Sequence, residues 1–341
     1  MKHTEKNHNI ALSNWLFACC GAVFLMIIIG AITRLTESGL SMVEWRPLIG
    51  ALPPMNEIEW LRVFDLYKDS PEFQKKNFTM ELAEFKNIFF WEWFHRLWGR
   101  MIGVIYALPF FFFLLRGWVP AGYKLKLFGL LILGGAQGFM GWYMVKSGLV
   151  DMPAVSHYRL AAHLSLAFLI YALMFWLALT LRKSAKDIVT KPNAALFKHG
   201  IGALCVLVIT ILWGAFTAGL DAGLVYNDSF PLMGGKVVPE EVWFYKPIWL
   251  NFFENHAGVQ FVHRWLAIAT VLAGLSITIH ALIKKRREIC FPLIGAMVLF
   301  QMGLGIATLM TNVNLHLATT HQAGAVLLLS FIIMGLHAVR R

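Results

Sequence analysis

The chain has 341 residues, of which 58% are hydrophobic and 14% are charged, and its mean hydropathy is +0.62. This composition is too apolar for a water-soluble fold of this length and is typical of a polytopic membrane protein. The formal net charge of +11 follows from the way basic residues are distributed among the loops, so it gives no reason to expect a nucleic-acid partner.

Eight apolar segments are long enough to cross about 30 Å of hydrocarbon at about 1.5 Å per residue. They lie at about residues 15–33, 89–115, 125–144, 158–181, 199–218, 257–283, 290–310 and 317–338. The first segment is long enough to stay as a helix and lacks a clear small-residue cleavage site, so we do not expect a cleaved signal peptide. The pattern predicts an all-α integral membrane protein with eight transmembrane helices.

Basic residues gather in alternate loops. The N-terminal tail, residues 116–126, 182–198 and 284–287, and the final pair 340–341 hold sixteen basic residues against two acidic ones. Positively charged flanks resist translocation, so these segments are expected to face the cytoplasm, with both termini inside. The N-terminus lacks the character of a transit peptide, which favours a bacterial inner membrane. No cysteine lies in an outer loop, so no disulfide is expected there.

The two halves of the chain share one sequence pattern. Residues 30–50 match residues 214–234 at a constant spacing of 184, and residues 94–96, 137–141 and 160–163 match residues 262–264, 301–305 and 318–321 in the same order. Because four is an even number of helices, both halves enter the membrane from the same side. We therefore predict two parallel-repeat four-helix bundles, at residues 1–190 and 191–341. The long outer loops, at about 34–88 and 219–256, are rich in aromatic residues and are expected to form ordered caps.

Four of the twelve histidines stand out by their position. His95, His163, His263 and His321 each lie about four to six residues inside the outer end of the second, fourth, sixth and eighth helix, at a depth of about 6 to 9 Å. A single buried histidine is more often a hydrogen-bonded core residue. Two in each half at matched depth favour a ligand site. The other histidines lie in tails, loops or helix ends, where hydration is the simpler explanation.

A pair of imidazoles facing each other across a four-helix bundle can bind both axial positions of a haem iron. Zinc would usually require three or four protein ligands, and neither half offers an obvious cysteine or further carboxylate to complete such a site. Arg96, Arg100, Arg159 and Arg264 are suited to pair with haem propionates, and phospholipid headgroups are an equal alternative for each of them.

Glu92 lies three residues before His95, on the same face of a helix, and the second half has Gln260 at the equivalent position. An acid in one half only indicates a division of labour. The N-terminal half would hold a porphyrin that is acted upon, with Glu92 as proton acceptor or water-orienting group, and the C-terminal half would hold a resident haem. The alternative is that Glu92 forms a structural ion pair with Arg96, four residues further on.

The motifs TRLTESGLSMVEWRPLIGALPP, EFKNIFFWEWFHRLWGR, GWYMVKSGL, YRLAAHL, AGLDAGLVYNDSFPLM, NFFENHAGVQFVHR and LATTHQAGAV together resemble the haem A synthase family, over nearly the whole chain. The resemblance implies an enzyme that oxidises the C8 methyl group of haem O to a formyl group through a hydroxymethyl intermediate, supplying haem A for cytochrome c oxidase. It implies Glu92 as the catalytic acid, His95 and His163 as ligands of the substrate haem iron, and His263 and His321 as axial ligands of the iron of a haem b cofactor.

The same resemblance points to haem O as substrate, to cytochrome c oxidase assembly, to haem O synthase as a candidate partner and to membrane lipid as surroundings, and it leaves a homo-oligomer open. Another branch of the family carries cysteine pairs in its outer loops, which this chain lacks. Two other functions compete. A di-haem b-type cytochrome would pass electrons without modifying haem, and a haem exporter or chaperone would hold a porphyrin weakly.

Overall fold

The computed structural model describes residues 3–44, 49–149, 153–185 and 191–340. Within these ranges eight helices are long and apolar enough to cross a membrane, as predicted. They are α1 (His3–Leu35), α4 (Leu82–Leu115), α5 (Lys124–Lys146), α6 (His157–Ala185), α7 (Ala194–Gly219), α9 (His256–Ile283), α10 (Cys290–Met310) and α11 (Leu315–Val339). Helices are the expected solution because each satisfies its backbone polar groups internally in a medium without water.

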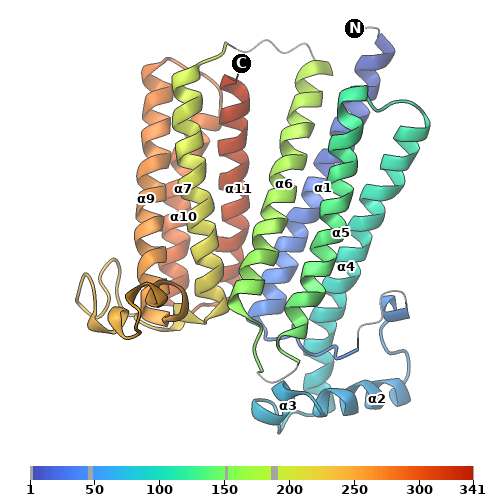
Figure 1. Ribbon diagram of the computed structural model, residues 1–341, viewed down its shortest axis with the longest axis vertical. Helices are drawn as coiled ribbons and strands as arrows, with labels where there is room; N and C mark the ends of the chain where they lie inside the picture. Colours follow the sequence, from blue (N-terminus) through green and yellow to red (C-terminus); the bar gives the residue numbers. More distant parts are fainter. Residues whose placement is uncertain (1–2, 45–48, 150–152, 186–190, 341) are drawn as a thin grey trace.

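The long helices run side by side in two groups (Figure 1). One group contains α1, α4, α5 and α6, and the other contains α7, α9, α10 and α11. The groups meet where α6 packs against α7 and α11 and where α1 packs against α11. A buried hydrogen bond between Tyr171 on α6 and Ser330 on α11, at 2.8 Å, and one from Gln322 on α11 to the carbonyl of Ile27 on α1, at 3.2 Å, cross this junction.

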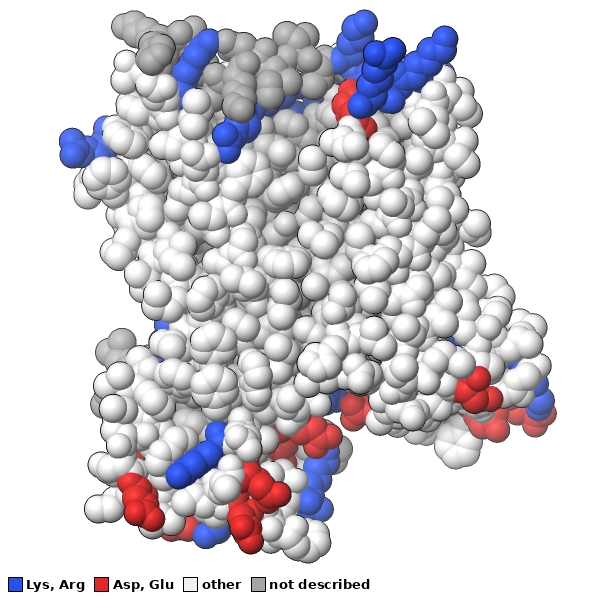
Figure 2. Space-filling view, turned by 180° about the vertical axis from the view of Figure 1, so that it is seen from behind, with Lys and Arg blue, Asp and Glu red and all other residues white. Residues whose placement is uncertain are grey.

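Both chain termini lie at the same end of the molecule (Figure 1). Figure 2 shows Lys and Arg predominating at that end, a broad uncharged band across the middle, and a mixture of acidic and basic residues at the opposite end. This distribution is the one expected of a protein whose terminal end faces the cytoplasm. Part of the predicted 182–198 loop, Lys2 and Arg341 lie outside the described residues.

The helix α4 begins earlier than the apolar pattern predicts. Its first residue is Leu82, not a residue near 89. The backbone N–H of Glu81 donates to the Glu84 carboxylate at 3.0 Å, completing a capping box that starts the helix in the polar sequence before the apolar run. His95 therefore lies more than three turns from the helix start, although it remains near the outer edge of the apolar segment.

Ordered caps cover the end of the molecule opposite the termini, as expected. The first contains η1 (Ile49–Ala51), α2 (Glu57–Lys68) and α3 (Pro71–Lys75), and the second contains η3 (Ala222–Leu224), η4 (Glu240–Trp243), η5 (Ile248–Leu250) and α8 (Asn251–Glu254). Buried aromatic side chains of Phe64, Tyr67, Phe85 and Phe89 join α2 to α4. Pro47 and Leu48, which belong to the repeated motif, lie outside the described residues.

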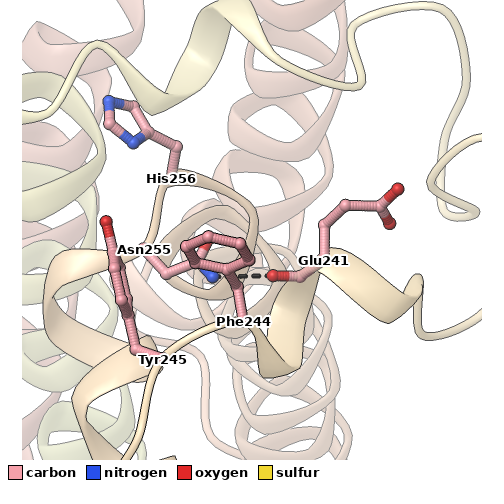
Figure 3. A pocket seen from close by; sticks show the side chains of 5 residues that line it. All are labelled: Glu241, Phe244, Tyr245, Asn255 and His256. Atoms are coloured by element: carbon pink, nitrogen blue, oxygen red, sulfur yellow. Dashed lines mark hydrogen bonds between the residues drawn. The ribbon is translucent and has the colours of Figure 1, made fainter.

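A surface cavity of about 130 Å³ lies in the second cap, next to the start of α9. Figure 3 shows its lining, in which the Asn255 amide donates to the backbone carbonyl of Glu241 at 2.6 Å. Asn255 also accepts from the backbone N–H groups of Ala257 and Gly258 and so caps α9. These contacts anchor the cap on the helix that carries His263.

Candidate functional site

The two predicted histidines of the first half each face a glycine of a neighbouring helix. His95 on α4 faces Gly30 of α1, where an added Cβ would lie 3.3 Å from the ring Nε2. His163 on α6 faces Gly141 of α5, where a Cβ would lie 3.1 Å from the ring Cε1. The Gln137 amide of α5 donates to the His163 carbonyl at 3.1 Å. The glycines leave room for the rings between closely spaced helices.

The second half repeats these contacts. His263 on α9 faces Gly214 of α7, where an added Cβ would lie 3.0 Å from the ring Cε1. His321 on α11 faces Gly305 of α10, where an added Cβ would lie 2.9 Å from the ring Cε1. The Gln301 amide donates to the His321 carbonyl at 2.7 Å. Corresponding residues in the two halves thus make corresponding contacts.

The Nδ1 atoms of His263 and His321 are buried without a hydrogen-bond partner among the described residues. Buried polar atoms of this kind call for an explanation, and a neutral imidazole has one lone pair for a metal. Paired imidazoles lined by glycines fit the two axial positions of a haem iron.

A closed zinc site fits less well. No group of three or more His, Cys, Asp or Glu side chains is arranged to hold a metal ion within the part of the chain that the structure describes. Structural zinc takes four protein ligands and catalytic zinc takes three. Two histidines per half are therefore fewer protein ligands than zinc usually takes.

Glu92 is buried on α4, with 2% of its surface exposed. Its Oε2 accepts hydrogen bonds from the Ser41 hydroxyl and from the Met42 backbone N–H, both at 2.7 Å, and its Oε1 accepts from Arg96 at 2.5 Å. The ion pair that sequence reasoning raised as an alternative is therefore present. Glu92 also holds the segment that follows α1 against the helix that carries His95.

Gln260 holds the equivalent segment of the second half, but as a hydrogen-bond donor to the loop where Glu92 is an acceptor. Its amide nitrogen donates to the carbonyls of Ala222, at 2.7 Å, and Val225, and its oxygen accepts from Arg264 Nε at 3.0 Å. Glu92 accepts from donors where Gln260 donates to acceptors. Both side chains tether a loop, but only the carboxylate of Glu92 can exchange a proton.

Three of the four arginines considered for propionates bind backbone carbonyls. Arg96 donates to Met42 at 3.0 Å, and Arg264 donates to Ser229 at 2.8 Å and to Leu232 at 2.7 Å. These bonds draw the outer loops onto α4 and α9. Arg159 donates to the Tyr143 carbonyl at 2.7 Å, and its guanidinium lies 3.8 Å from the centre of the Tyr143 ring. Arg100 lies four residues beyond Arg96 on α4.

Hydration is the wrong explanation for two of the other histidines. His157 is buried where the two groups of helices meet, and a Cβ at Gly219 would lie 2.6 Å from its own Cβ. His337 is buried near the end of α11, with its Nε2 3.2 Å from the Thr180 hydroxyl and its ring edge on to Trp176. Both contacts join segments more than sixty residues apart, so the local sequence carried no signal of them.

Eight apolar helices, with two histidines in each half that lie opposite glycines of neighbouring helices, define a multi-pass membrane protein with a matching histidine pair in each half. The family model of COX15-CtaA, described as cytochrome oxidase assembly protein, matches residues 13–333. The chain therefore belongs to this family, in agreement with the prediction, and is a multi-pass protein of the bacterial inner membrane that works with haem.

Curated relatives match almost end to end. The chain is 51% identical over 335 residues to the Heme A synthase of Rhodospirillum centenum, covering 97% of this chain and 88% of the relative. It is 47% identical over 332 residues to the Heme A synthase of Nitrosospira multiformis, covering 96% and 93%. It is 42% identical over 343 residues to the Heme A synthase of Maricaulis maris, covering 100% and 99%.

Proposed function

We propose that this protein is a haem A synthase, which oxidises the C8 methyl group of haem O to a formyl group through a hydroxymethyl intermediate. The reaction takes place in the first half, residues 1–190, and the second half, residues 191–341, holds a haem b cofactor. The observation that carries this assignment is the asymmetry between Glu92 and Gln260 beside otherwise matching histidine pairs. Near-complete matches to relatives named Heme A synthase support it.

The second histidine pair suits a resident cofactor. His263 and His321 would hold the iron of haem b, and the Gln301 bond to the His321 carbonyl holds α10 against the helix that carries His321. A bound haem supplies one-electron redox chemistry, which no protein side chain provides for an unactivated methyl group. Gln260, the neutral counterpart of Glu92, leaves this half without a proton-exchanging side chain at the same position.

The first histidine pair suits the substrate. His95 and His163 would bind the iron of haem O and so fix the position of the macrocycle against α4 and α6. Glu92, one helical turn from His95, would accept protons released as the methyl group is oxidised. The Ser41 and Met42 bonds hold the carboxylate in one orientation, and Arg96 stabilises its charge. After a second oxidation, loss of water yields the formyl group.

The orientation and the supply of substrate follow from the same arrangement. The end that carries both termini and most of the basic residues would face the cytoplasm (Figures 1 and 2). The histidine pairs, which are nearer the other ends of α4, α6, α9 and α11, would then lie towards the outer side. Haem O carries a long apolar chain that favours the bilayer, so haem O synthase in the same membrane would be its donor. The product would enter cytochrome c oxidase assembly.

Mass spectrometry of the pigment tests this function directly. Haem extracted from the purified protein should contain haem O, its hydroxylated form or haem A together with haem b. A di-haem cytochrome is the second candidate, favoured by the complete set of hydrogen bonds that makes Glu92 a structural tether. Haem b alone, at two molecules per chain, would support the cytochrome and contradict the synthase.

A further inference from the structure

The two halves differ in the wall between their second and third long helices. In the second half α9 and α10 pack closely. Val298 of α10 is 1% exposed, and a Cβ added at Gly274 of α9 would lie only 2.5 Å from its Cγ1. About one turn away, a Cβ added at Gly295 of α10 would lie 3.1 Å from the side chain of Thr278 on α9. Side chains of one helix therefore fill the space left by glycines of the other.

In the first half the residue that corresponds to Val298 is a glycine, and two nearby positions that carry Val271 and Met302 in the second half are also glycines. The match of Gln137 to Gln301 places Gly134 at the position of Val298 and Gly138 at the position of Met302, and the match of His95 to His263 places Gly103 at the position of Val271. Gly103, Gly134 and Gly138 are exposed, and an added Cβ at any of them would meet no other atom within 4 Å. We call these three residues the open wall.

The open wall belongs to the inward side of its helices. On α5, Gly134 is four residues from Leu130, which is 4% exposed, and Gly138 is three residues from Gly141, which faces His163. Residues three or four apart share a helix face, so these glycines are on the side that points into the bundle. On α4, Gly103 lies three residues before Tyr106, whose hydroxyl donates to the Leu127 carbonyl of α5 at 2.8 Å.

The position of the open wall relative to the histidines is specific. Gly138 and Gly134 lie about one and two turns from Gly141 in the direction away from the outer end, so the wall starts near His163 and extends about 10 Å towards the membrane centre. Tyr106 and Leu127 close the seam below it. The wall thus begins near the level of the first histidine pair.

We propose that the open wall admits the isoprenoid chain of the substrate haem, and that Val271, Val298 and Met302 exclude such a chain from the second half. The inference rests on the proposed function and assigns the part of that site that recognises the tail. Haem O and haem b differ by a hydroxyethylfarnesyl chain in place of a vinyl group. A wall without side chains accommodates the long chain, whereas the filled wall rejects it by steric conflict.

Recognition of the hydroxyl group at the start of the isoprenoid chain does not distinguish the two halves. The Gln137 side-chain oxygen, between Gly134 and Gly138 on α5, is buried without a hydrogen-bond partner among the described residues, and it is suited to accept from the hydroxyl of the tail. Gln301 of the second half has an equally unpartnered oxygen. The glycines of the open wall would therefore determine whether haem O or haem b is bound.

The experiment installs the side chains of the second half in the first. The full-length protein with haem b in its second half carries Gly134→Val, Gly138→Met or both, and is titrated with haem O and separately with haem b while the Soret difference spectrum is recorded. The double variant should bind haem O at least tenfold more weakly than the wild type and bind haem b within twofold of it. Unchanged absorbance of the resident haem verifies that each variant is folded.

Gly135→Leu is the matched control, since it lies on the same helix and its counterpart, Leu299, is 55% exposed. It should leave both affinities unchanged. Equal weakening of haem O and haem b in the double variant, or no weakening of either, overturns the assignment of the tail. A wild-type protein that binds no second porphyrin of either kind contradicts the proposed function itself, which distinguishes that failure from a failure of the open wall.

Discussion

The two halves of this protein hold their histidines in the same way but surround them differently. In each half two rings pack against glycines of neighbouring helices, and a glutamine bonds the carbonyl of the fourth-helix histidine. The halves diverge at Glu92 and Gln260 and at the wall beside the rings. The arrangement of the histidines is thus common to both halves, whereas a carboxylate on the same helix face and the exposed glycines of the open wall are specific to the first half.

This difference underlies the proposal that both halves bind a haem and that only the first half acts on it. Gln260 performs the tethering function of Glu92 with reversed hydrogen-bond polarity, so tethering alone does not require an acid. A buried carboxylate is costlier to place than an amide. The acid is therefore best explained by chemistry that only one half performs.

Removing the acid should have the largest effect. In Glu92→Gln, the side chain can no longer exchange a proton at the site of the methyl group, so formation of haem A should fall at least a hundredfold, about 3 kcal/mol or more in transition-state stabilisation. The measurement is the ratio of haem A to haem O in the extracted pigment. The resident haem b should remain. Normal turnover in this variant would remove the basis for distinguishing the two halves, and Gln260→Glu serves as the reciprocal control.

Removing one ligand should affect one half only. His263→Ala or His321→Ala deletes an axial ligand of the resident haem and should abolish most of its Soret absorbance. His95→Ala and His163→Ala should leave that absorbance in place and prevent binding of haem O. Survival of the spectrum in both second-half variants would show that the ligand assignment is wrong.

The two caps should respond differently to pH. Burial raises the pKa of Glu72 in α3 to about 7, against an opposing hydrogen bond from Tyr67, whereas Glu240 and Glu241 in the second cap are exposed. Because the folded state holds the Glu72 proton more tightly, this contribution to stability is complete below about pH 4.5 and is lost as pH rises through about 7, by at most about 3 kcal/mol.

Proteolysis or hydrogen exchange of the first cap, followed from pH 5 to pH 8, measures this loss. Glu72→Gln should make the first cap insensitive to pH over the same range, and the second cap should change little in either protein. A second cap that loosens as much as the first would contradict the assignment of the effect to Glu72.

Crowding a single ring should give the smallest effect. In Gly305→Ala the new methyl group would lie 2.9 Å from His321 Cε1, so the ring must shift, at a cost of about 1 to 2 kcal/mol in binding of the resident haem. Gly303→Ala, two residues earlier, meets nothing within 4 Å and should be neutral or slightly stabilising. Equal haem affinities in the two variants would show that Gly305 is not needed for the position of the ring.

The sequence was sufficient where a property is local or is imposed by the bilayer. Hydrophobic length alone predicts the eight helices, because a segment in lipid must satisfy its own backbone hydrogen bonds. The matched spacing of the two halves predicted four histidines at equivalent positions, which the structure places opposite glycines of neighbouring helices, and the motifs identified the family. The early start of α4 was missed because the capping box of Glu81 and Glu84 lies before the apolar run.

The tertiary structure decided the features that depend on contacts between segments far apart in the sequence. The bond between Glu92 and Ser41 joins residues 51 positions apart, and the burial of His157 depends on Gly219 in the other group of helices. The glycines of the open wall were visible in the sequence, but their exposure depends on what α4 presents opposite α5. Chain periodicity determines which face of a helix is apolar, and only helix packing determines whether that face is filled.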